Sequence, residues 1–164
     1  DPTIHLFLDD RLYVKEIDDR VRLYTANARV EAEPVGDLAA FLSRDPTKVL
    51  VVAPEPELDR LAAGLAPVLG NRLNMNKSKP HFLEFSHREA TKGRALARLA
   101  AMFGLGREEI MAIGDGYNDL DMLEYAGTGV VMANARPEVK AAADWVTAAN
   151  DADGVAAALE RFVL

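Results

Sequence analysis

Apolar residues in the first half of the chain recur with two different periods. Alternation every second residue, or a compact apolar run, predicts a β-strand, and a spacing of three to four residues predicts a helix. Turn-forming residues separate these segments, so two of the strand pairs are expected to be β-hairpins. The predicted order is hairpin, helix, strand, helix and hairpin, over residues 4–8 with 12–16, then 35–42, 47–53, 54–69, and 72–77 with 81–85. Residues 18–33 show no clear period, although 29–33 alternate weakly.

The first half is therefore expected to form an antiparallel sheet with both helices on one face. After residue 91, helices and strands alternate along the chain, which is typical of a parallel sheet with right-handed crossovers. We predict an α/β protein in two parts, an α+β domain over residues 1–88 and a parallel α/β part over 89–164, joined by a polar hinge at 86–90. The elements expected in the second part cover residues 91–104, 110–114, 119–126, 129–132, 137–143, 145–147 and 153–162.

Composition narrows the function classes. About half of the 164 residues are apolar, which supports a buried core and argues against disorder. The formal net charge is −7 and no Lys/Arg cluster is present, so we expect no nucleic-acid partner. No apolar run reaches the ~18 residues of a membrane span, and no signal peptide precedes the first strand. Cysteine is absent, which excludes disulfides and Cys-bound zinc. We expect a cytoplasmic protein without a membrane partner.

One apolar run in the second half is followed by residues that could bind a ligand or a metal. It stops at Gly114-Asp115-Gly116, and Asn118 and Asp119 open the following helix. The two acids can face the crevice beyond the carboxyl end of a strand, where open α/β sheets bind ligands. Paired acids repel each other unless a cation lies between them, and oxygen ligands without His or Cys favour Mg²⁺. A simple turn followed by a helix cap would explain the same residues without any function.

Lys92 is the second candidate. It lies in the first turn of a predicted helix, with Thr91 as the expected N-cap and Gly93 beside it. A positive side chain there opposes the helix dipole by about 0.3–1 kcal/mol. A bound anion would remove this penalty and would use the free N–H groups of the first turn. The alternative is an ordinary solvent-facing lysine.

Two stretches carry a resemblance to a known family. Residues 114–123 read GDGYNDLDML, and residues 131–135 read VMANA. They resemble the last motif of the haloacid dehalogenase-like (HAD) phosphatases, with the closest likeness to the Cof-type sugar-phosphatase branch. The resemblance is strong over residues 92–164. It implies that residues 89–164 are the C-terminal half of the HAD-like Rossmannoid core, and that residues 1–88 are a C2-type cap.

The resemblance also implies roles for four residues. Asp115 would ligate Mg²⁺, Asp119 would hold the ion or its bound water, and Asn118 would bind the phosphoryl group. Lys92, which matches the family's lysine motif, would neutralise that group and help to hold the nucleophile. The implied activity is Mg²⁺-dependent hydrolysis of small phosphorylated metabolites, such as sugar phosphates, through an aspartyl-phosphate.

The sequence departs from the family at the nucleophile. The family places an Asp-x-Asp-Gly-Thr motif after its first strand, whereas Asp9 is followed by Asp10-Arg11-Leu12-Tyr13 and is better explained as a hairpin turn. We therefore predict that residues 1–164 alone are inactive. Without the nucleophile strand, strand 110–114 is expected to be an open edge that self-associates or pairs with a companion chain.

Three alternatives remain open at this stage. They are an excised domain of a P-type cation pump, a non-catalytic fragment that binds phosphorylated ligands or partners, and a phosphomutase with the same cap. The fold alone does not choose among these chemistries. Flavin or pyridoxal phosphates are further substrate candidates. The residues considered for contact with substrate, without a choice among them, are Arg11, Tyr13, Arg72 and Asn74.

Overall fold

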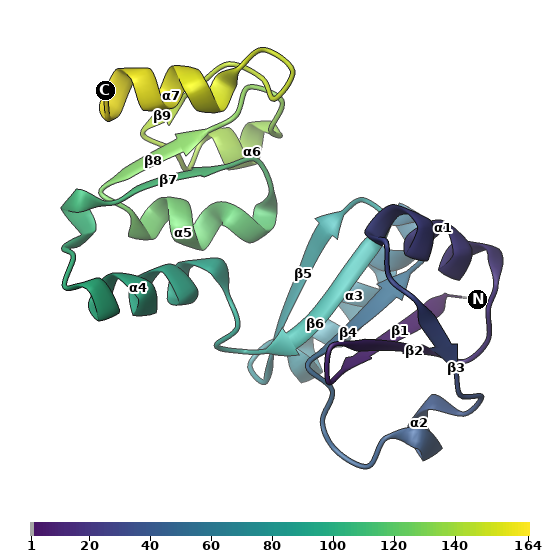
Figure 1. Ribbon diagram of the computed structural model, residues 1–164. Helices are drawn as coiled ribbons and strands as arrows, with labels where there is room; N and C mark the ends of the chain where they lie inside the picture. Colours follow the sequence, from purple (N-terminus) through teal and green to yellow (C-terminus); the bar gives the residue numbers. More distant parts are fainter. Residues whose placement is uncertain (1) are drawn as a thin grey trace. The chain divides into compact units, whose positions relative to one another are not determined.

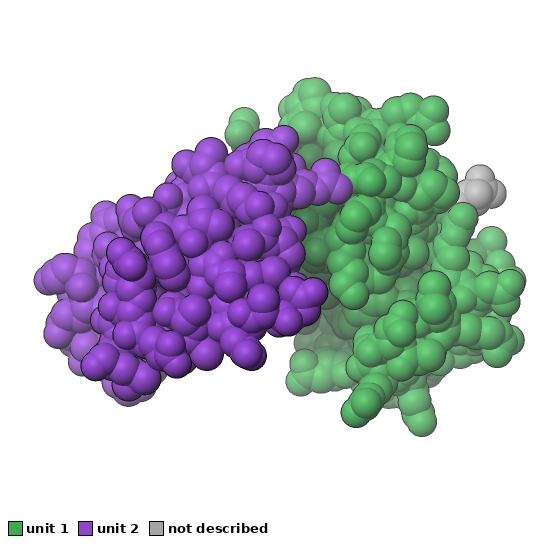
Figure 2. Space-filling view, turned by 90° about the horizontal axis from the view of Figure 1, so that it is seen from above, with its two compact units in different colours: residues 1–88 green, residues 89–164 purple. Residues whose placement is uncertain are grey.

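The computed structural model describes residues 2–164 and divides into two compact units, Asp1–Arg88 (unit 1) and Glu89–Leu164 (unit 2) (Figure 2). Unit 1 contains a largely antiparallel sheet, and unit 2 contains a separate parallel sheet (Figure 1). This confirms the α/β fold class predicted from the sequence.

Unit 1 is built on one six-stranded sheet in the order β3-β2-β1-β4-β6-β5. Its strands are β1 (Thr3–Leu8), β2 (Arg11–Val14), β3 (Ala32–Pro34), β4 (Lys48–Val52), β5 (Leu73–Lys79) and β6 (Phe82–His87). Both predicted hairpins are confirmed, because β1 pairs antiparallel with β2 and β5 pairs antiparallel with β6. Only the short β2–β3 pair is parallel.

The two hairpin turns differ from each other. Asp9 and Asp10 both have positive φ angles, 53° and 58°, as a two-residue turn between twisted strands requires. Asp9 forms an ion pair with Arg44. In the second hairpin the predicted turn at 78–80 is misplaced, because β5 continues to Lys79 through a register shift between Lys77 and Lys79.

Helices cover both faces of this sheet. The predicted helices are α2 (Leu38–Phe41) and α3 (Glu55–Leu69). Phe41 contacts Tyr13, and α3 packs on the face that carries Leu83 and Phe85. The residue registers place Tyr13 and Phe85 on one face, so α2 and α3 share it as predicted.

The sequence did not predict a third helix, α1 (Asp19–Ala28), which covers part of the opposite face. Asp18 caps it by accepting a hydrogen bond from the N–H of Val21 at 2.7 Å. Val21 is its one fully buried residue and packs with Leu12 and Val14. The helix therefore lacks the repeated apolar positions that sequence periodicity detects.

His5, on β1, is an unusual core residue. Its side chain is 0% exposed, and neither ring nitrogen has a hydrogen-bond partner among residues 2–164. The ring stands edge-on to Tyr24, with centroids 4.8 Å apart. Burial lowers the pKa of His5 from 6.5 to about 4, against an opposing effect of Asp18 and with a further lowering by Lys48. His5 is thus neutral in the folded state at neutral pH.

Acid is therefore expected to destabilise unit 1 through His5. Between pH 6.5 and about 4 the unfolded chain binds a proton that the folded chain excludes, so stability is complete above this window and falls as the pH drops. The loss by the lower limit is about 3 kcal/mol. His5→Leu should abolish this pH dependence of the free energy of unfolding, measured by urea unfolding at several pH values and followed by NMR signals of unit 1. His81→Gln, which replaces an exposed histidine, should keep the wild-type pH dependence. An unchanged pH dependence in His5→Leu would contradict the role of His5.

Unit 2 has a three-stranded parallel sheet in the order β7-β8-β9. Its strands are β7 (Met111–Gly114), β8 (Thr128–Val131) and β9 (Trp145–Val146), and its helices are α4 (Lys92–Phe103), α5 (Leu120–Tyr125), α6 (Pro137–Lys140) and α7 (Gly154–Phe162). Short 3₁₀ turns at Arg107–Glu109 and Tyr117–Asp119 precede β7 and α5. This confirms the predicted alternation. Within residues 2–164, no helix has the length and apolar character needed to cross a membrane.

Candidate functional site

Polar residues of unit 2 gather where the parallel strands end. The loop Gly114-Asp115-Gly116 begins at the last residue of β7, Asn134 follows β8, and Asn150 lies in the segment after β9. The carboxyl ends of parallel strands lie at one edge of a sheet, which is where α/β proteins bind ligands. The loops of this edge form the candidate site.

Asp119 is buried against the Gly114–Gly116 loop. Only 4% of this residue is exposed. Oδ2 accepts hydrogen bonds from the backbone N–H of Asp115 at 3.0 Å and of Gly116 at 2.9 Å. A Cβ at Gly114 would lie 2.5 Å from the Cβ of Asp119, so this position requires glycine. The carboxylate thus fixes the shape of the loop.

The second oxygen of Asp119 binds the other candidate residue. Oδ1 accepts a hydrogen bond from Nζ of Lys92, which is the first residue of α4. Gly93 allows the start of α4 to lie close to α5, because a Cβ at this position would lie 2.5 Å from the backbone oxygen of Asp121 in α5. Thr91 caps α4 as predicted by accepting from the N–H of Arg94. Residues 27 positions apart are in this way joined in one ion pair.

The charge state of Asp119 follows from these contacts. Burial acts to raise its pKa, but the hydrogen bond from Lys92 lowers it, as do the two backbone N–H groups and the positive charge of Lys92. The net result is a pKa below the ordinary value of 3.8. Asp119 is therefore an anion at neutral pH, and Lys92 has a fixed counter-ion.

Asp115 has a different environment. It is exposed, and its Oδ2 accepts a hydrogen bond from Nδ2 of Asn134 at 3.0 Å. Oδ1 of Asn134 in turn accepts from the backbone N–H of Asn150 at 3.0 Å. Sequence reasoning did not select Asn134. The available signal was its position, an amide side chain just beyond a buried strand that neighbours the Asp115 strand.

The structure brings all four predicted residues into one region of unit 2. Lys92 and Asp119 are in contact, Asp119 holds the loop of Asp115, and the half-buried Asn118 lies on the same turn. A Cβ at Gly116 would lie 2.6 Å from Oδ1 of Asn118. Among residues 2–164 there is no cluster of three or more His, Cys, Asp or Glu side chains suited to a metal. The side-chain oxygens considered for a metal near the loop are those of the Asp115 carboxylate and the Asn118 amide, because both oxygens of Asp119 already accept hydrogen bonds from protein donors.

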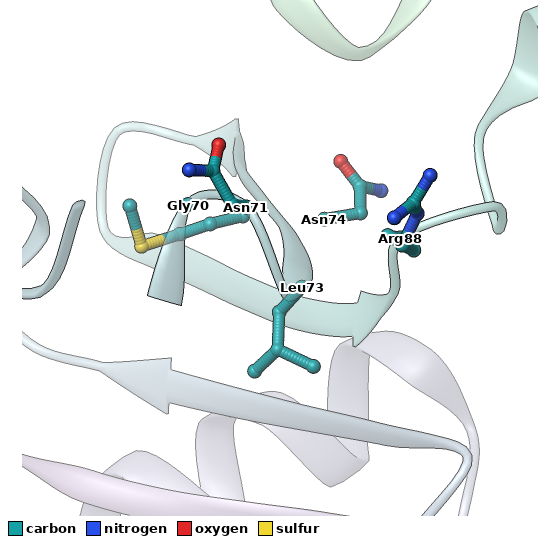
Figure 3. A pocket seen from close by; sticks show the side chains of 6 residues that line it. Gly70, Asn71, Leu73, Asn74 and Arg88 are labelled. Carbon is teal, nitrogen blue, oxygen red and sulfur yellow. The ribbon is translucent and has the colours of Figure 1, made fainter. Parts of the chain in front are cut away.

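Unit 1 has a polar hollow of its own, with a volume of about 580 Å³. It is lined by Gly70, Asn71, Leu73, Asn74, Met75 and Arg88. In Figure 3, the side chains of Asn71, Asn74 and Arg88 point in one direction, and that of Leu73 points in the opposite direction. Of the residues considered for contact with substrate, Asn74 lines this hollow, whereas Arg11 pairs with Glu33.

Comparison with known proteins identifies relatives along nearly the whole chain. Residues 2–159 match the family model described as haloacid dehalogenase-like hydrolase. The chain is 37% identical over 130 residues to the 5-amino-6-(5-phospho-D-ribitylamino)uracil phosphatase YitU of Bacillus subtilis, covering 78% of this chain and 48% of YitU. It is 50% identical over 84 residues to the phosphatase YwpJ of the same organism, covering 51% of this chain and 30% of YwpJ. The chain thus spans half or less of these two relatives.

Solved structures give the same result. A haloacid dehalogenase-like hydrolase from Bacteroides thetaiotaomicron superposes with a TM-score of 0.79 at 34% identity, covering 98% of this chain and 60% of that protein. The HAD subclass IIB sugar phosphatase BT4131 superposes with a TM-score of 0.82 at 26% identity, again covering 98% and 60%. Both similarities include unit 1 and unit 2.

Proposed function

The chain belongs to the haloacid dehalogenase-like hydrolases, and on that basis we propose that the complete protein is a Mg²⁺-dependent phosphatase whose site in this chain is the Asp115 loop with Lys92. The observation that carries the proposal is the Lys92–Asp119 ion pair beneath the loop. The ammonium group of Lys92 lies near the carboxyl end of the sheet, where it could offset the negative charge of a phosphoryl group in a chain whose net charge is −7.

Each residue has a role in this proposal. Asp115, exposed and held by Asn134, would be a direct ligand of Mg²⁺, and Asn118 would hydrogen-bond the phosphoryl group. Both oxygens of Asp119 accept hydrogen bonds from protein donors, so we assign Asp119 to holding Lys92 and the loop, with at most a metal-bound water as its contact. Hard oxygen donors of this kind suit Mg²⁺. When bound, the ion would offset the negative charge that develops on the phosphoryl oxygens.

The reaction needs a nucleophile, which we propose lies on polypeptide outside residues 1–164. By resemblance it is an aspartate carboxylate that attacks phosphorus while the ester P–O bond breaks, and the leaving alkoxide oxygen takes a proton from water to become the alcohol. Water then hydrolyses the acyl phosphate. Strand β7 is an edge of the sheet in the described chain, and we propose that the nucleophile strand pairs there.

The substrate class is proposed from the relatives and from unit 1. One relative is named for a phosphoribityl compound, and a solved structure is named a sugar phosphatase. We therefore propose a phosphomonoester of a hydroxyl-rich metabolite. The amides of Asn71 and Asn74 and the guanidinium of Arg88 give the hollow of unit 1 groups that suit hydroxyl or anionic substituents.

Phosphate release tests this proposal. Residues 1–164 alone should release no phosphate from sorbitol 6-phosphate or p-nitrophenyl phosphate. The complete protein, with an Asp-x-Asp-Gly-Thr segment before unit 1, should release it only with Mg²⁺. Turnover by residues 1–164 alone would contradict the external nucleophile.

Two other results would favour the alternatives. Phosphate that moves within a sugar phosphate without release would indicate a phosphomutase. Mg²⁺-dependent binding of a phosphate mimic without turnover by the complete protein would indicate a phospholigand-binding module.

A further inference from the structure

A line of hydrogen bonds crosses the three loops at the carboxyl edge of unit 2. It runs from the Asp115 carboxylate to the Asn134 amide and on to the backbone N–H of Asn150. We infer that Asn134 is a positioning residue, which sets the direction of the Asp115 carboxylate and thereby its affinity for a divalent cation. The inference rests on the proposed role of Asp115 as a metal ligand.

Only one orientation of the Asn134 amide satisfies both neighbours. The Asp115 carboxylate can only accept a hydrogen bond, and the backbone N–H of Asn150 can only donate one. Nδ2 must therefore face Asp115 and Oδ1 must face Asn150, as observed at 3.0 Å each. The amide cannot flip without losing both bonds, so its donor keeps a fixed direction.

The anchor at Asn150 is itself held firmly. The hydroxyl of Thr147, which is buried, donates to the backbone oxygen of Gly154 at 2.6 Å. A Cβ at Gly154 would lie 2.1 Å from the backbone oxygen of Ala148, so the chain before Asn150 packs directly on the start of α7. The N–H of Ala133 donates to the oxygen of Ala148, which ties the two loops together.

Asp115 needs such a partner. Asp119 is buried and fixed by three donors, whereas Asp115 is exposed, and an exposed carboxylate samples several rotamers. The bond from Asn134 selects one rotamer and engages one oxygen, which directs the other oxygen. Partners that orient a metal ligand typically change metal affinity by about 10–100-fold when removed.

The test measures Mn²⁺ affinity of the complete protein by electron paramagnetic resonance, which is independent of turnover. Asn134→Leu, similar in size but without hydrogen-bonding groups, should weaken Mn²⁺ binding roughly 10–100-fold. In an Asp115→Ala background the same substitution should have no further effect, because no side-chain oxygen remains at residue 115 for Asn134 to orient. Asn150→Ala is the matched control, since it keeps the backbone N–H and should leave the affinity unchanged.

The outcomes separate the two proposals. An unchanged Mn²⁺ affinity in Asn134→Leu, or an equal loss in both backgrounds, would overturn the positioning role. A complete protein that binds no Mn²⁺ would overturn it together with the metal role of Asp115. If Mn²⁺ binds and depends on Asn134 but no phosphate ester is hydrolysed, the inference stands and the phosphatase proposal fails.

Discussion

Asp115→Asn should lower kcat/KM of the complete protein for phosphomonoesters by about 10²–10³-fold, the loss expected when a group that stabilises transition-state charge is removed. The substitution keeps size and shape, and the amide oxygen that it introduces can still accept from Asn134. It removes the one exposed carboxylate of the Gly114–Gly116 loop, and with it the negative charge proposed to hold Mg²⁺. The fold should survive, because Asp119 and not Asp115 holds the loop.

Phosphate release and thermal unfolding together check this expectation. The matched control is Asp151→Asn, which removes an exposed carboxylate from the segment after β9 and should leave both values near wild type. Raising the Mg²⁺ concentration should recover part of the lost activity, since a weakened site fills at higher metal. A variant with wild-type kcat/KM would exclude Asp115 as a ligand, and a variant that unfolds would assign it to the fold.

The elements of unit 2 could be predicted from its sequence because each carries a strong local signal. Helix α4 has a side-chain cap at Thr91, an apolar stripe and a left-handed Gly104 at its end, with φ of 68°. Strand β7 is a short apolar run that stops at glycine. In each case the local preference agrees with the tertiary structure, so the pattern alone is sufficient.

Helix α1 could not be predicted, for a physical reason. It contributes one fully buried residue, Val21, and its other positions are mostly polar. Its place is fixed by tertiary contacts, namely the hydrogen bond that the Thr3 hydroxyl donates to Asp18 and the edge-to-face contacts of Tyr24 with His5 and Phe7. Such contacts depend on where β1 lies in the sheet, which periodicity within residues 18–33 does not contain.

The candidate site shows the same division. Asp115, Asn118 and Asp119 could be proposed from one contiguous motif. The different environments of the two acids could not, because they depend on Lys92 in another helix and on Asn134 beyond another strand. The contiguous motif thus predicts which residue types are present at the site, whereas contacts between distant segments decide which of the two acids faces solvent.

Lys92→Met should lower kcat/KM of the complete protein by about 10²–10³-fold as well, because it removes the cation proposed to stabilise the phosphoryl group. Its effect on stability distinguishes it from Asp115→Asn. In the wild type the pKa of Asp119 lies below 3.8, so its contribution to folding is present at neutral pH and is lost only as the pH falls through that low value. Burial raises the pKa of Asp119, and without Lys92 only two backbone N–H groups counteract this effect, so the pKa should rise.

Lys92→Met should therefore lower the free energy of unfolding of unit 2 most at neutral pH, and the difference from the wild type should shrink in acid as Asp119 becomes protonated in both proteins. The checks are urea unfolding of unit 2 at neutral and acid pH, followed by its NMR signals, and the titration of the Asp119 carboxyl carbon. Lys92→Arg, which keeps the charge, should retain most of the wild-type stability at neutral pH. Arg94→Met, which removes an exposed cation of α4 that pairs with Glu89 before the helix, should leave the titration of Asp119 unchanged. If the Asp119 titration and the free energy of unfolding at neutral pH stay fixed in Lys92→Met while activity falls, Lys92 acts on the substrate alone, and its bond to Asp119 does not stabilise the site.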